Sequence, residues 1–568
     1  MTRLSIGSFG PRRSWVRPGQ PVAVDAEIIA AAEVRAEMTV TLLDLDRVVG
    51  TVRRRVALGP SATQHTIRME LPPRPRHGYG LSIRVASAEW TATASSAIEA
   101  LDGWWQSPRH TAMTDYQDPQ ATDIAMRDLV RWHVTVVQHY DWMWRHYRYR
   151  PPDGATTFAD TLGREVSHDA VHAGIRAGHA VGIASLAYGS VYGAEAEHVE
   201  RYPDDRVFDE HGEPLSLGGT FFINDLRSGS PWRRRLLAEY SGAIRRFGFD
   251  GIHMDSYGAP HAAVSADGEA IDFAALYPDL ITEAAGRVAA AHHGARVVFN
   301  CVEGFPLQSV ARAPTACLYL ELWPPDRAFS DVVRWVGRAR AVAEGRQVVI
   351  AAYAATLREV PSWTHRQEAA EAVLQLGTVI AVAGAYHHIL AERDRVLVEG
   401  YYPAAVALRA AEAREMRALW RFTARYVHLL SDPRRAVANT HGLCVLDADG
   451  RTIVTSSRPL PGTIWAVATS APGGQRVLHL VDLRDQEDEH WDSPKHRPRL
   501  NDGLRLHWPL CAPVAASPWS AQGDAGTLRL ATAARGGVWV LPPFRRWLMI
   551  VEAEDHAPRS GQSSSGNT

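Results

Sequence analysis

Short segments of alternating apolar and polar residues run through the first hundred residues of the chain. Examples are residues 21–28, 38–45 and 66–71, and proline and glycine interrupt the chain between them. Alternation with a period of two places one side of a strand in a core and leaves the other in water. We therefore expect residues 1–102 to form a small antiparallel β-sandwich.

From about residue 130 the pattern changes to apolar runs of five to eight residues that alternate with longer amphipathic stretches. This pattern is typical of βα units around a parallel sheet. Amphipathic helices are predicted at 230–247, 272–292, 330–344 and 365–376. Strands are predicted at 133–140, 180–187, 220–224, 251–255, 296–300, 315–321, 347–353 and 378–382. Eight such repeats predict a (β/α)8 TIM barrel over residues 103–432, with a doubly wound sheet as the alternative.

A helical stretch at 403–429 closes this region, and short strands then return. They are predicted at 441–446, 452–455, 463–469, 476–482, 527–531 and 547–551, with glycine- and proline-containing turns between them. We expect a second antiparallel β-sandwich over residues 433–556. The serine- and glycine-rich end, 557–568, is expected to be a disordered tail.

Composition narrows the class of protein. A chain of 568 residues exceeds what one hydrophobic core supports, and 46% apolar with 22% charged residues is typical of a globular protein. The 61 basic and 63 acidic residues leave a net charge of −2. This balance lacks the excess of positive charge that is typical of proteins that bind nucleic acid or a membrane surface.

The cysteines and the amino terminus indicate the cellular compartment of the protein. Cys301, Cys317, Cys444 and Cys511 are scattered without C-x-x-C spacing, which argues against a disulfide scaffold or a zinc knuckle. Residues 1–18 hold no apolar run of signal-peptide length, and no later window is long enough for a transmembrane helix. A cytoplasmic monomer is expected for the sequence as written, and a secreted one if the start site is incomplete.

Polar residues that end the apolar runs are the candidates for chemistry, because the carboxyl ends of barrel strands surround the active-site mouth. Asp255 ends one predicted strand and Glu321 ends another two strands along. Paired carboxylates across one mouth suit cleavage of a glycosidic bond. The apolar and aromatic neighbours of Glu321 favour a raised pKa, whereas Asp255 has more polar company. The alternative is that each carboxylate is only solvated or ion-paired.

Metal and nucleotide chemistry lack support. The i, i+4 pair His168 and His172 has no His-Glu-x-x-His context and no third ligand, and is interpreted as lying on a helix surface. No phosphate-binding loop, dinucleotide fingerprint or serine-hydrolase elbow occurs in the sequence. We expect neither a metal nor a cofactor.

Several segments, in chain order from about residue 15 to 553, resemble glycoside hydrolase family 66, which contains endo-dextranases and cycloisomaltooligosaccharide glucanotransferases. The segments that carry the resemblance are 104–109, 140–146, 187–189, 248–255, 319–323, 384–388, 400–403, 478–483 and 539–544. The resemblance implies an immunoglobulin-like amino-terminal domain, a catalytic barrel and a carboxyl-terminal β-sandwich.

The resemblance also implies roles. Asp255 matches the family's nucleophile and Glu321 its acid/base, in a mechanism that retains anomeric configuration through a covalent glucosyl–Asp255 intermediate. The remaining residues at the mouth are expected to hold a glucosyl unit, Trp323 as an acceptor-side platform for which core packing is the alternative. They are Asp141, Trp142, Tyr188, Asn300, Trp323, Tyr353 and His388.

Three functions are weighed. The first is a retaining, endo-acting glycoside hydrolase that cleaves α-1,6-linked glucan, dextran or isomaltooligosaccharides. The chain lacks the domain-sized barrel insertion of cyclising members, which favours hydrolysis over the second, a cycloisomaltooligosaccharide-type glucanotransferase. The third is a non-catalytic α-glucan-binding relative, against which the presence of both Asp255 and Glu321 argues. The loop after Asp255, residues 256–260, and the 301–304 segment depart from the family pattern and leave the preference for dextran open.

Overall fold

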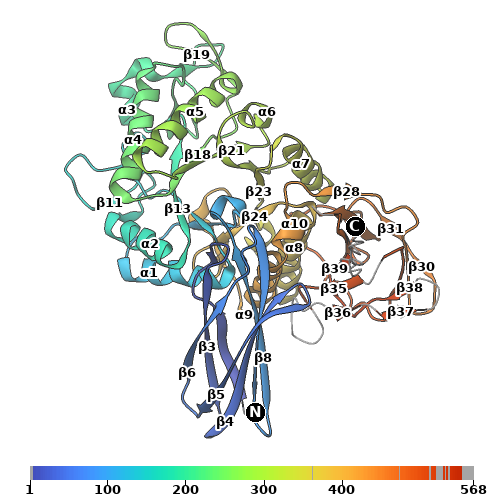
Figure 1. Ribbon diagram of the computed structural model, residues 1–568. Helices are drawn as coiled ribbons and strands as arrows, with labels where there is room; N and C mark the ends of the chain where they lie inside the picture. The colour runs from blue at the N-terminus through green and yellow to red at the C-terminus, as the bar shows by residue number, and fades with distance from the viewer. Residues whose placement is uncertain are drawn as a thin grey trace, which may run out of the picture.

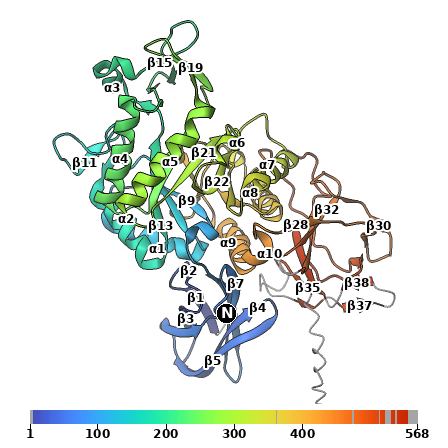
Figure 2. The ribbon, with the colours of Figure 1, turned by 45° about the horizontal axis from the view of Figure 1, so that its top comes forward.

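The structure is a computed structural model. It describes residues 4–360, 362–471, 474–510, 513–519, 529–530, 532–534 and 538–552. The predicted tail at 557–568 lies outside these residues, as does Cys511. Figures 1 and 2 show two β-rich regions, one at each end of the chain, packed against a central region of strands and helices. Among the described residues, no helix is long and apolar enough to cross a membrane.

The amino-terminal region consists of two sheets that share one hydrophobic core. Every second residue of β3 is buried, so Val22, Val24, Ala26 and Ile28 face that core, as the alternating pattern predicts. The first sheet has the order β1-β3-β6, with β1 (Leu4–Pro11), β3 (Pro21–Ala30) and β6 (Thr63–Glu70). The second has the order β2-β8-β7-β4-β5, with β2 (Trp15–Val16), β4 (Val34–Asp44), β5 (Arg47–Leu58), β7 (His77–Ala86) and β8 (Thr91–Ala100).

The central region is built on a curled sheet whose neighbouring strands run parallel from β9 to β24. β25 (Leu390–Ala391) follows β24 after one residue and pairs in parallel with β9, so the last parallel segment lies beside the first. In chain order the strands are β9 (His110–Met113), β10 (Val136–His139), β13 (Ala184–Ser190), β18 (Gly251–Asp255), β21 (Arg296–Val302), β22 (Thr315–Glu321), β23 (Gln347–Ala351) and β24 (Tyr386–His388). β26 (Arg395–Val396) and β27 (Val406–Ala407) extend the sheet in antiparallel fashion beyond β25.

Helices follow these strands along the chain and cover the sheet (Figures 1 and 2). Four agree with the predicted helices to within a few residues at most ends, although α8 extends seven residues further toward the carboxyl terminus. They are α4 (Pro231–Phe247), α5 (Phe273–Ala291), α7 (Phe329–Val342) and α8 (Trp363–Ala383). The others are α1 (Pro119–Asp128), α2 (His168–Val181), α3 (Ala196–Arg201), α6 (Leu307–Val310), α9 (Ala410–Arg425) and α10 (Val427–Leu430). Single 3-10 turns include η1 (Trp104–Gln106), η2 (Leu129–Trp132), η3 (Pro203–Asp205), η4 (Ala355–Leu357) and η5 (Tyr402–Ala404).

Two of the predicted parallel strands are wrong. Residues 378–382 lie inside α8, where Val379, Ile380 and Val382 are fully buried, so a helix with apolar residues on every side imitated a buried strand. Residues 220–224 contain β17 (Phe221–Ile223), which pairs with β14 and β16 outside the parallel sheet. The strands in their place are β9 and β24 with β25, which are too short to give an apolar run of their own.

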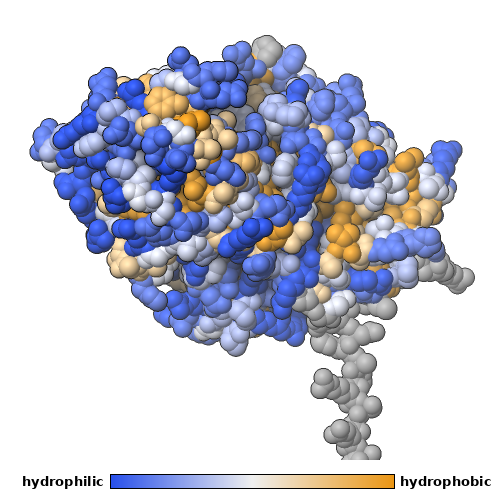
Figure 3. Space-filling view, turned by 90° about the horizontal axis from the view of Figure 1, so that it is seen from above, coloured by the Kyte–Doolittle hydropathy of each residue, from blue (hydrophilic) through white to orange (hydrophobic). Residues whose placement is uncertain are grey.

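Small antiparallel sheets project from the carboxyl ends of the parallel strands, with β19 labelled at the top of Figure 1 and β11 at its left. The hairpin of β11 (Thr157–Ala159) and β12 (Glu165–Ser167) follows β10. β14 (Gly193–Ala194) and β16 (Ser216–Leu217) join β17, while β15 (Val207–Phe208) pairs with β19 (Ala262–Ser265), which pairs with β20 (Ala270–Asp272). Seen from above, the surface is largely hydrophilic, with apolar residues gathered in separate patches (Figure 3).

The carboxyl-terminal region again holds two sheets around a shared core. One contains β28 (Ala436–Ala438), β31 (Thr455–Ser456), β32 (Ile464–Ser470), β33 (Arg476–Asp482), β35 (Pro513–Ala516), β36 (Arg529–Leu530) and β39 (Trp547–Glu552). The other contains β29 (Cys444–Leu446), β30 (Thr452–Ile453), β34 (Arg505–His507), β37 (Thr532–Ala534) and β38 (Val538–Val540). The predicted boundaries after residues 102 and 432 fall between elements, β8 and η1 in one case and α10 and β28 in the other, and stay predictions.

Buried ion pairs join the regions. Arg109, just before β9, pairs with Glu99 of β8, and these side chains are 2% and 0% exposed. Arg546, before β39, pairs with Glu371 of α8, at 2% and 3% exposure. Truncation of one partner of such a pair leaves a buried charge uncompensated, so each pair penalises any other docking of the two regions.

Candidate active site

A cavity of about 360 Å³ opens at the carboxyl ends of the parallel strands. Asp255 ends β18 and Glu321 ends β22, so both predicted carboxylates reach it from strand ends. Its other walls come from the turn after β10, from the β14–β17 excursion and from the segment after β26. The lining residues are Tyr140, Asp141, His146, Leu162, Tyr188, Leu217, Phe221, Asp255, Ser256, Tyr257, Val302, Glu303, Glu321, Trp323, Gly400 and Tyr401.

One amide group connects the two carboxyl groups. Asn300 lies on β21, the strand between β18 and β22, and its side chain is 3% exposed. Its Nδ2 donates hydrogen bonds to Oδ1 of Asp255 at 2.8 Å and to Oε2 of Glu321 at 2.6 Å. An amide nitrogen has two protons, so both bonds can form at once.

This shared donor limits the separation of the carboxyl groups. The two accepting oxygens can lie no further apart than the sum of the two hydrogen-bond lengths. That limit falls within the ~5–5.5 Å expected of retaining glycosidases and short of the ~6.5–9.5 Å of inverting ones. This limit is shorter than the separation that an inverting pair needs in order to hold a water molecule.

Each carboxyl group has a tyrosine donor of its own. Tyr188, on β13, donates from its hydroxyl to Oδ2 of Asp255 at 2.8 Å. Tyr353, just after β23, donates to Oε1 of Glu321. Each carboxyl group therefore accepts one hydrogen bond from its own tyrosine and one from the Asn300 amide that both groups share.

Burial controls the protonation of the pair. It raises the pKa of Asp255, and the charge of Glu321 raises it further, while the bonds from Asn300 and Tyr188 lower it. Burial also raises the pKa of Glu321, against the bonds from Tyr353 and Asn300. Because two neighbouring buried carboxylates cannot both ionise cheaply, the pair retains one proton well above the usual pKa of a carboxyl group.

A second charged network lies beside the pair. The side chain of His146 is buried between Glu195, whose Oε1 lies 2.9 Å from Nδ1, and Asp141, whose Oδ1 lies 3.7 Å from Nε2. Burial by itself lowers the pKa of His146, but the charges of Glu195 and Asp141 outweigh it and raise that pKa to about 10. Burial likewise opposes ionisation of Glu195, and His146 lowers its pKa to about 2. His146 is therefore a cation at neutral pH.

Asp141 occupies an unusual backbone position. Its φ of 44° is in the left-handed region, where aspartate is among the few tolerated side chains. Arg164 holds the turn, because its Nη2 donates to the Asp141 carbonyl at 3.3 Å and lies 3.5 Å from Oδ2. The turn directs Asp141 into the cavity that Asp255 and Glu321 share.

Of the residues predicted to hold a sugar, Asp141, Tyr188 and Trp323 line the cavity. Asn300 and Tyr353 instead lie behind it and bind the carboxyl groups, so they position the pair. A Cβ at Gly400 would lie 3.0 Å from Trp323 Cζ2, so glycine permits the close approach of the 400 loop to this indole.

Two of the predicted sugar contacts are wrong on geometry. Trp142 is 0% exposed, donates from Nε1 to the Tyr188 carbonyl at 3.1 Å and packs against Phe247 and Phe249. His388 is also 0% exposed, and its Nδ1 lies 2.6 Å from the hydroxyl of Tyr319. Both side chains support the site from within the core, because no surface of either is left for a ligand.

The sequence interpretation missed several residues of the cavity. Tyr140 and His146 belong to the same 140–146 segment as Asp141, so their position after a strand was the available signal. Glu303 was noted only as a departure from the family pattern. Ser256, Tyr257 and Val302 lie in the same two departing segments, 256–260 and 301–304. The remaining residues reach the site from longer excursions that no strand-end rule covers, and they are Leu162, Leu217, Phe221, Gly400 and Tyr401.

Potential metal ligands gather elsewhere. Asp44, His77 and His428 bring their ligand atoms within 4.8 Å of one another, at the contact between β4, β7 and α10. Arg74 and Arg47 already pair with Asp44, which opposes a cation there. His168, predicted to lie on a helix surface, is buried against Phe158 and Phe247, so its place on that surface is wrong.

A close pair of carboxyl groups at the carboxyl ends of a curled parallel sheet is the arrangement expected of a glycoside-cleaving enzyme. The sequence profile of "Glycosyl hydrolase family 66" matches residues 13–539. The chain belongs to this family, which confirms the resemblance drawn from the sequence.

Two curated relatives are similar, both named cycloisomaltooligosaccharide glucanotransferase and both from Niallia circulans. One is 24% identical over 383 residues, which are 62% of this chain and 39% of the relative. The other is 24% identical over 388 residues, 63% of this chain and 39% of the relative. The matched part of this chain thus spans well under half the length of these relatives.

A solved structure shares the fold. It is the cycloisomaltooligosaccharide glucanotransferase of a Paenibacillus species complexed with cycloisomaltoheptaose, with a TM-score of 0.86 and 18% identity. The alignment covers 96% of this chain and 100% of that one. The arrangement of sheets therefore matches a member of the same family over nearly the whole length.

The buried cation at His146 predicts a specific pH dependence of stability. The folded-state pKa, about 10, lies above the unfolded value of ~6.5, so the stabilisation is complete below ~6.5 and is lost as the pH rises through about 10. The deficit in Tm of His146→Gln should therefore be largest at neutral pH and shrink by roughly 2–4 °C or more toward pH 10. Thermal unfolding followed by circular dichroism measures it.

The matched control is His211→Gln, because His211 is exposed and its acidic neighbours are the exposed Glu210 and the half-buried Asp209. Its Tm should equal that of the parent at every pH. A His146→Gln deficit that is constant across the pH range would contradict a buried imidazolium.

Proposed function

We propose that the protein is a retaining, endo-acting glycoside hydrolase that cleaves α-1,6-linked glucan by double displacement. The observation that carries the proposal is the Asn300 amide, which bonds both carboxyl groups and so keeps them within the separation expected of a retaining pair. The α-1,6 linkage and the endo mode rest on membership of family 66 and on the names of the relatives.

In the first step a carboxylate oxygen of Asp255 attacks the anomeric carbon. The bond from that carbon to the glycosidic oxygen breaks, and Glu321 transfers its proton to the departing oxygen. The products are a glucosyl–Asp255 ester and a shortened glucan. Tyr188 and Asn300 donate to Asp255 and keep it aligned for this attack.

In the second step the roles of Glu321 reverse. Its carboxylate takes a proton from water, the water oxygen bonds to the anomeric carbon, and the ester bond to Asp255 breaks. Asp255 leaves as a carboxylate and Glu321 is protonated again. Net retention follows, because the anomeric carbon is inverted twice.

Sugar contacts are assigned to the residues that line the cavity. Asp141 accepts hydrogen bonds from glucosyl hydroxyls, and the half-buried Trp323, which packs on Tyr353 with 5.3 Å between centroids, offers an indole face to the acceptor side. Tyr401 is 37% exposed, lines the same cavity and offers a second ring. The substrate is an uncharged polysaccharide, which agrees with the near-neutral chain.

We infer that the curled sheet is a closed (β/α)8 barrel, because its first and last parallel segments pair through β9 and β25. We also infer that the flanking two-sheet regions are β-sandwiches, an immunoglobulin-like one at the amino terminus and a second at the carboxyl terminus. The shared cores support this assignment. A monomeric state and the cellular location expected from the sequence remain predictions.

The alternative is a cycloisomaltooligosaccharide-type glucanotransferase, which the names of both curated relatives favour. It differs only in the second step, where a sugar hydroxyl replaces water as the acceptor. Products from isomaltooligosaccharides of graded length separate the two functions. Reducing ends that increase with each bond cleaved indicate hydrolysis, and cyclic or lengthened products without new reducing ends indicate transfer.

Substitution of the pair tests the catalytic assignment. Asp255→Ala and Glu321→Gln should each lower kcat/KM on dextran by roughly a thousandfold or more, because each removes an interaction worth several kcal/mol in the transition state. Azide should restore turnover of an activated α-glucoside by Glu321→Gln, since azide needs no general base.

Glu303→Gln is the matched control, because Glu303 lines the same cavity, is exposed, and its side chain affects Glu321 only through its charge, with no side-chain hydrogen bond to it among the described residues. It should stay within tenfold of the parent. Activity within tenfold of the parent for Asp255→Ala or Glu321→Gln would overturn the mechanism.

The separate tyrosine donors predict different changes in the pH profile of kcat/KM. Tyr188→Phe removes a bond that lowers the pKa of Asp255, so the acidic limb should move to higher pH by roughly one unit. Tyr353→Phe removes a bond that lowers the pKa of Glu321, so the alkaline limb should move up instead. Asn300→Ala should raise both limbs. A shift of the alkaline limb alone in Tyr188→Phe would contradict the assigned roles.

A further inference from the structure

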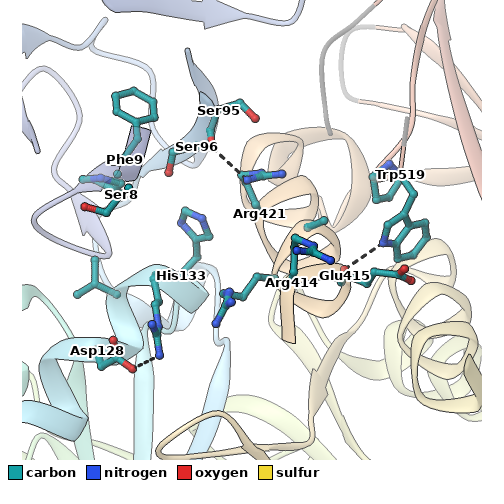
Figure 4. Close-up of a pocket in the computed structure, with 18 of the residues that line it drawn as sticks. Ser8, Phe9, Ser95, Ser96, Asp128, His133, Arg414, Glu415, Arg421 and Trp519 are labelled. Carbon is teal, nitrogen blue, oxygen red and sulfur yellow. Dashed lines mark hydrogen bonds and ion pairs between the residues drawn. The ribbon is translucent and has the colours of Figure 1, made fainter. Parts of the chain in front are cut away.

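A larger cavity, of about 910 Å³, lies where the three regions of the chain meet (Figure 4). β1 forms one wall, and α1 with η2 forms a second. The third wall is α9, and carboxyl-terminal residues 497–500, 518–519 and 545–546 complete the cavity. η2 leads into the amino end of β10, so this cavity lies at the opposite end of that strand from the carboxyl pair.

The lining carries a large excess of positive charge. Its acidic members are Asp25, Asp128 and Glu415, and Asp25 pairs with Arg12 outside the cavity. Its arginines are Arg127, Arg131, Arg414, Arg417, Arg421, Arg497, Arg545 and Arg546. A concave surface with so many guanidinium groups concentrates anions.

Part of this charge is already compensated. Five of the arginines have carboxylate partners: Arg127 pairs with Asp123, Arg131 with Asp128 and Asp394, Arg417 with Asp394, Arg497 with Glu415, and Arg546 with Glu371 and Glu415. In contrast, Arg414 makes no hydrogen bond or ion pair with any residue that the structure describes. Arg545 donates to the Pro498 carbonyl at 2.7 Å and has no carboxylate partner within the described ranges.

Two buried nitrogen atoms of the lining also lack partners. They are Nη1 of Arg546 and Nδ1 of His133, neither of which has a hydrogen-bond acceptor or donor among the described residues. Both side chains are 2% exposed. His133 has φ 54° at the end of η2, and Figure 4 shows it between Ser8 and Phe9 on one side and Arg414 and Arg421 on the other. Buried polar groups without partners are uncommon, and a ligand rich in acceptor oxygens would satisfy both.

We propose that this cavity binds a small, multiply charged oxyanion, a molecule with two or more phosphate or carboxylate groups. Guanidinium groups match the planar oxygen pairs of both groups with paired hydrogen bonds, which lysine does not. The volume exceeds what one inorganic phosphate needs, and Phe9 and Trp519 supply ring faces for an organic body. The site is distinct from the sugar cavity and shares none of its lining residues.

Because the walls come from all three regions, the bound anion links them. Binding to the folded state alone raises Tm by mass action. The amino-terminal sheets, the parallel sheet and the carboxyl-terminal sheets should therefore unfold together at a higher temperature in the presence of the ligand.

Titration of the full-length protein tests the proposal. Pyrophosphate and citrate are the probes, with calorimetry and Tm measured at constant ionic strength adjusted with sodium chloride. The double variant Arg414→Gln/Arg545→Gln should bind at least about tenfold more weakly than the parent, because each guanidinium contributes charge-assisted bonds. Arg451→Gln is the control, since Arg451 is 81% exposed and lies outside the cavity.

Unliganded Tm values show that the variants are folded, and Arg414→Gln should match the parent because Arg414 has no described partner to lose. Binding of pyrophosphate alone assigns a phosphate-bearing ligand, binding of citrate alone assigns a carboxylate-bearing one, and binding of both supports the shared chemistry. Failure of both probes to bind, or equal binding by the parent and the double variant, would overturn the site. Isomaltotriose binding that the double variant loses would also overturn it, because the cavity would then be a second sugar site.

Discussion

The active site depends on a single side-chain amide. Asp255 and Glu321 stand on strands that have β21 between them, so their backbones lie roughly 9–10 Å apart at the usual strand spacing. Their side chains converge on Asn300, which β21 places between them. Register fixes this relation, since Asn300 pairs with Tyr319 and Val302 pairs with Glu321 along the parallel ladder. The shared donor offsets part of the repulsion between these two buried carboxyl groups, which favours keeping one of them protonated.

The histidines buried beneath the carboxyl pair are neutral, so they do not compensate the negative charge of Asp255 and Glu321. His110, His253 and His388 contact Tyr319 within the curled sheet, and all are buried. Burial lowers the pKa of His110 to about 4 and also lowers those of His253 and His388, so these rings are neutral at physiological pH. A cation at any of these positions would favour ionisation of both carboxyl groups and so remove the proton that the proposed mechanism assigns to Glu321. The cationic His146 lies beside Asp141 and Glu195 instead, where two carboxylates already neutralise it.

The carboxyl pair could be predicted from sequence because its location follows a rule of topology: parallel strands end at a common face. The side chains that only touch the site could not. Trp142 follows β10 as directly as Asp141 does, yet the left-handed turn at Asp141 sends one side chain to the cavity and the other into the core. The strand prediction at 378–382 failed for a related reason. Around residues 378–382 the helix is buried on all sides and has no polar face, so Thr378 and the four apolar residues that follow fit both structures until packing decides.

Buried ion pairs of arginine fix how the regions dock on one another, as apolar packing fixes the structure within each region. Arg109 with Glu99 and Arg546 with Glu371 are fully enclosed, so only one docking of the two flanking regions leaves no buried charge unpaired. Elsewhere at the junction the arginines lack such partners. Arg414 is exposed and Arg545 bonds only to a carbonyl among the described residues, so these guanidinium groups favour water or anions around them. An arginine-rich junction is therefore specific where carboxylates meet the arginines and remains open where they do not, and the open part is the cavity between α9, β1 and the carboxyl-terminal sheets.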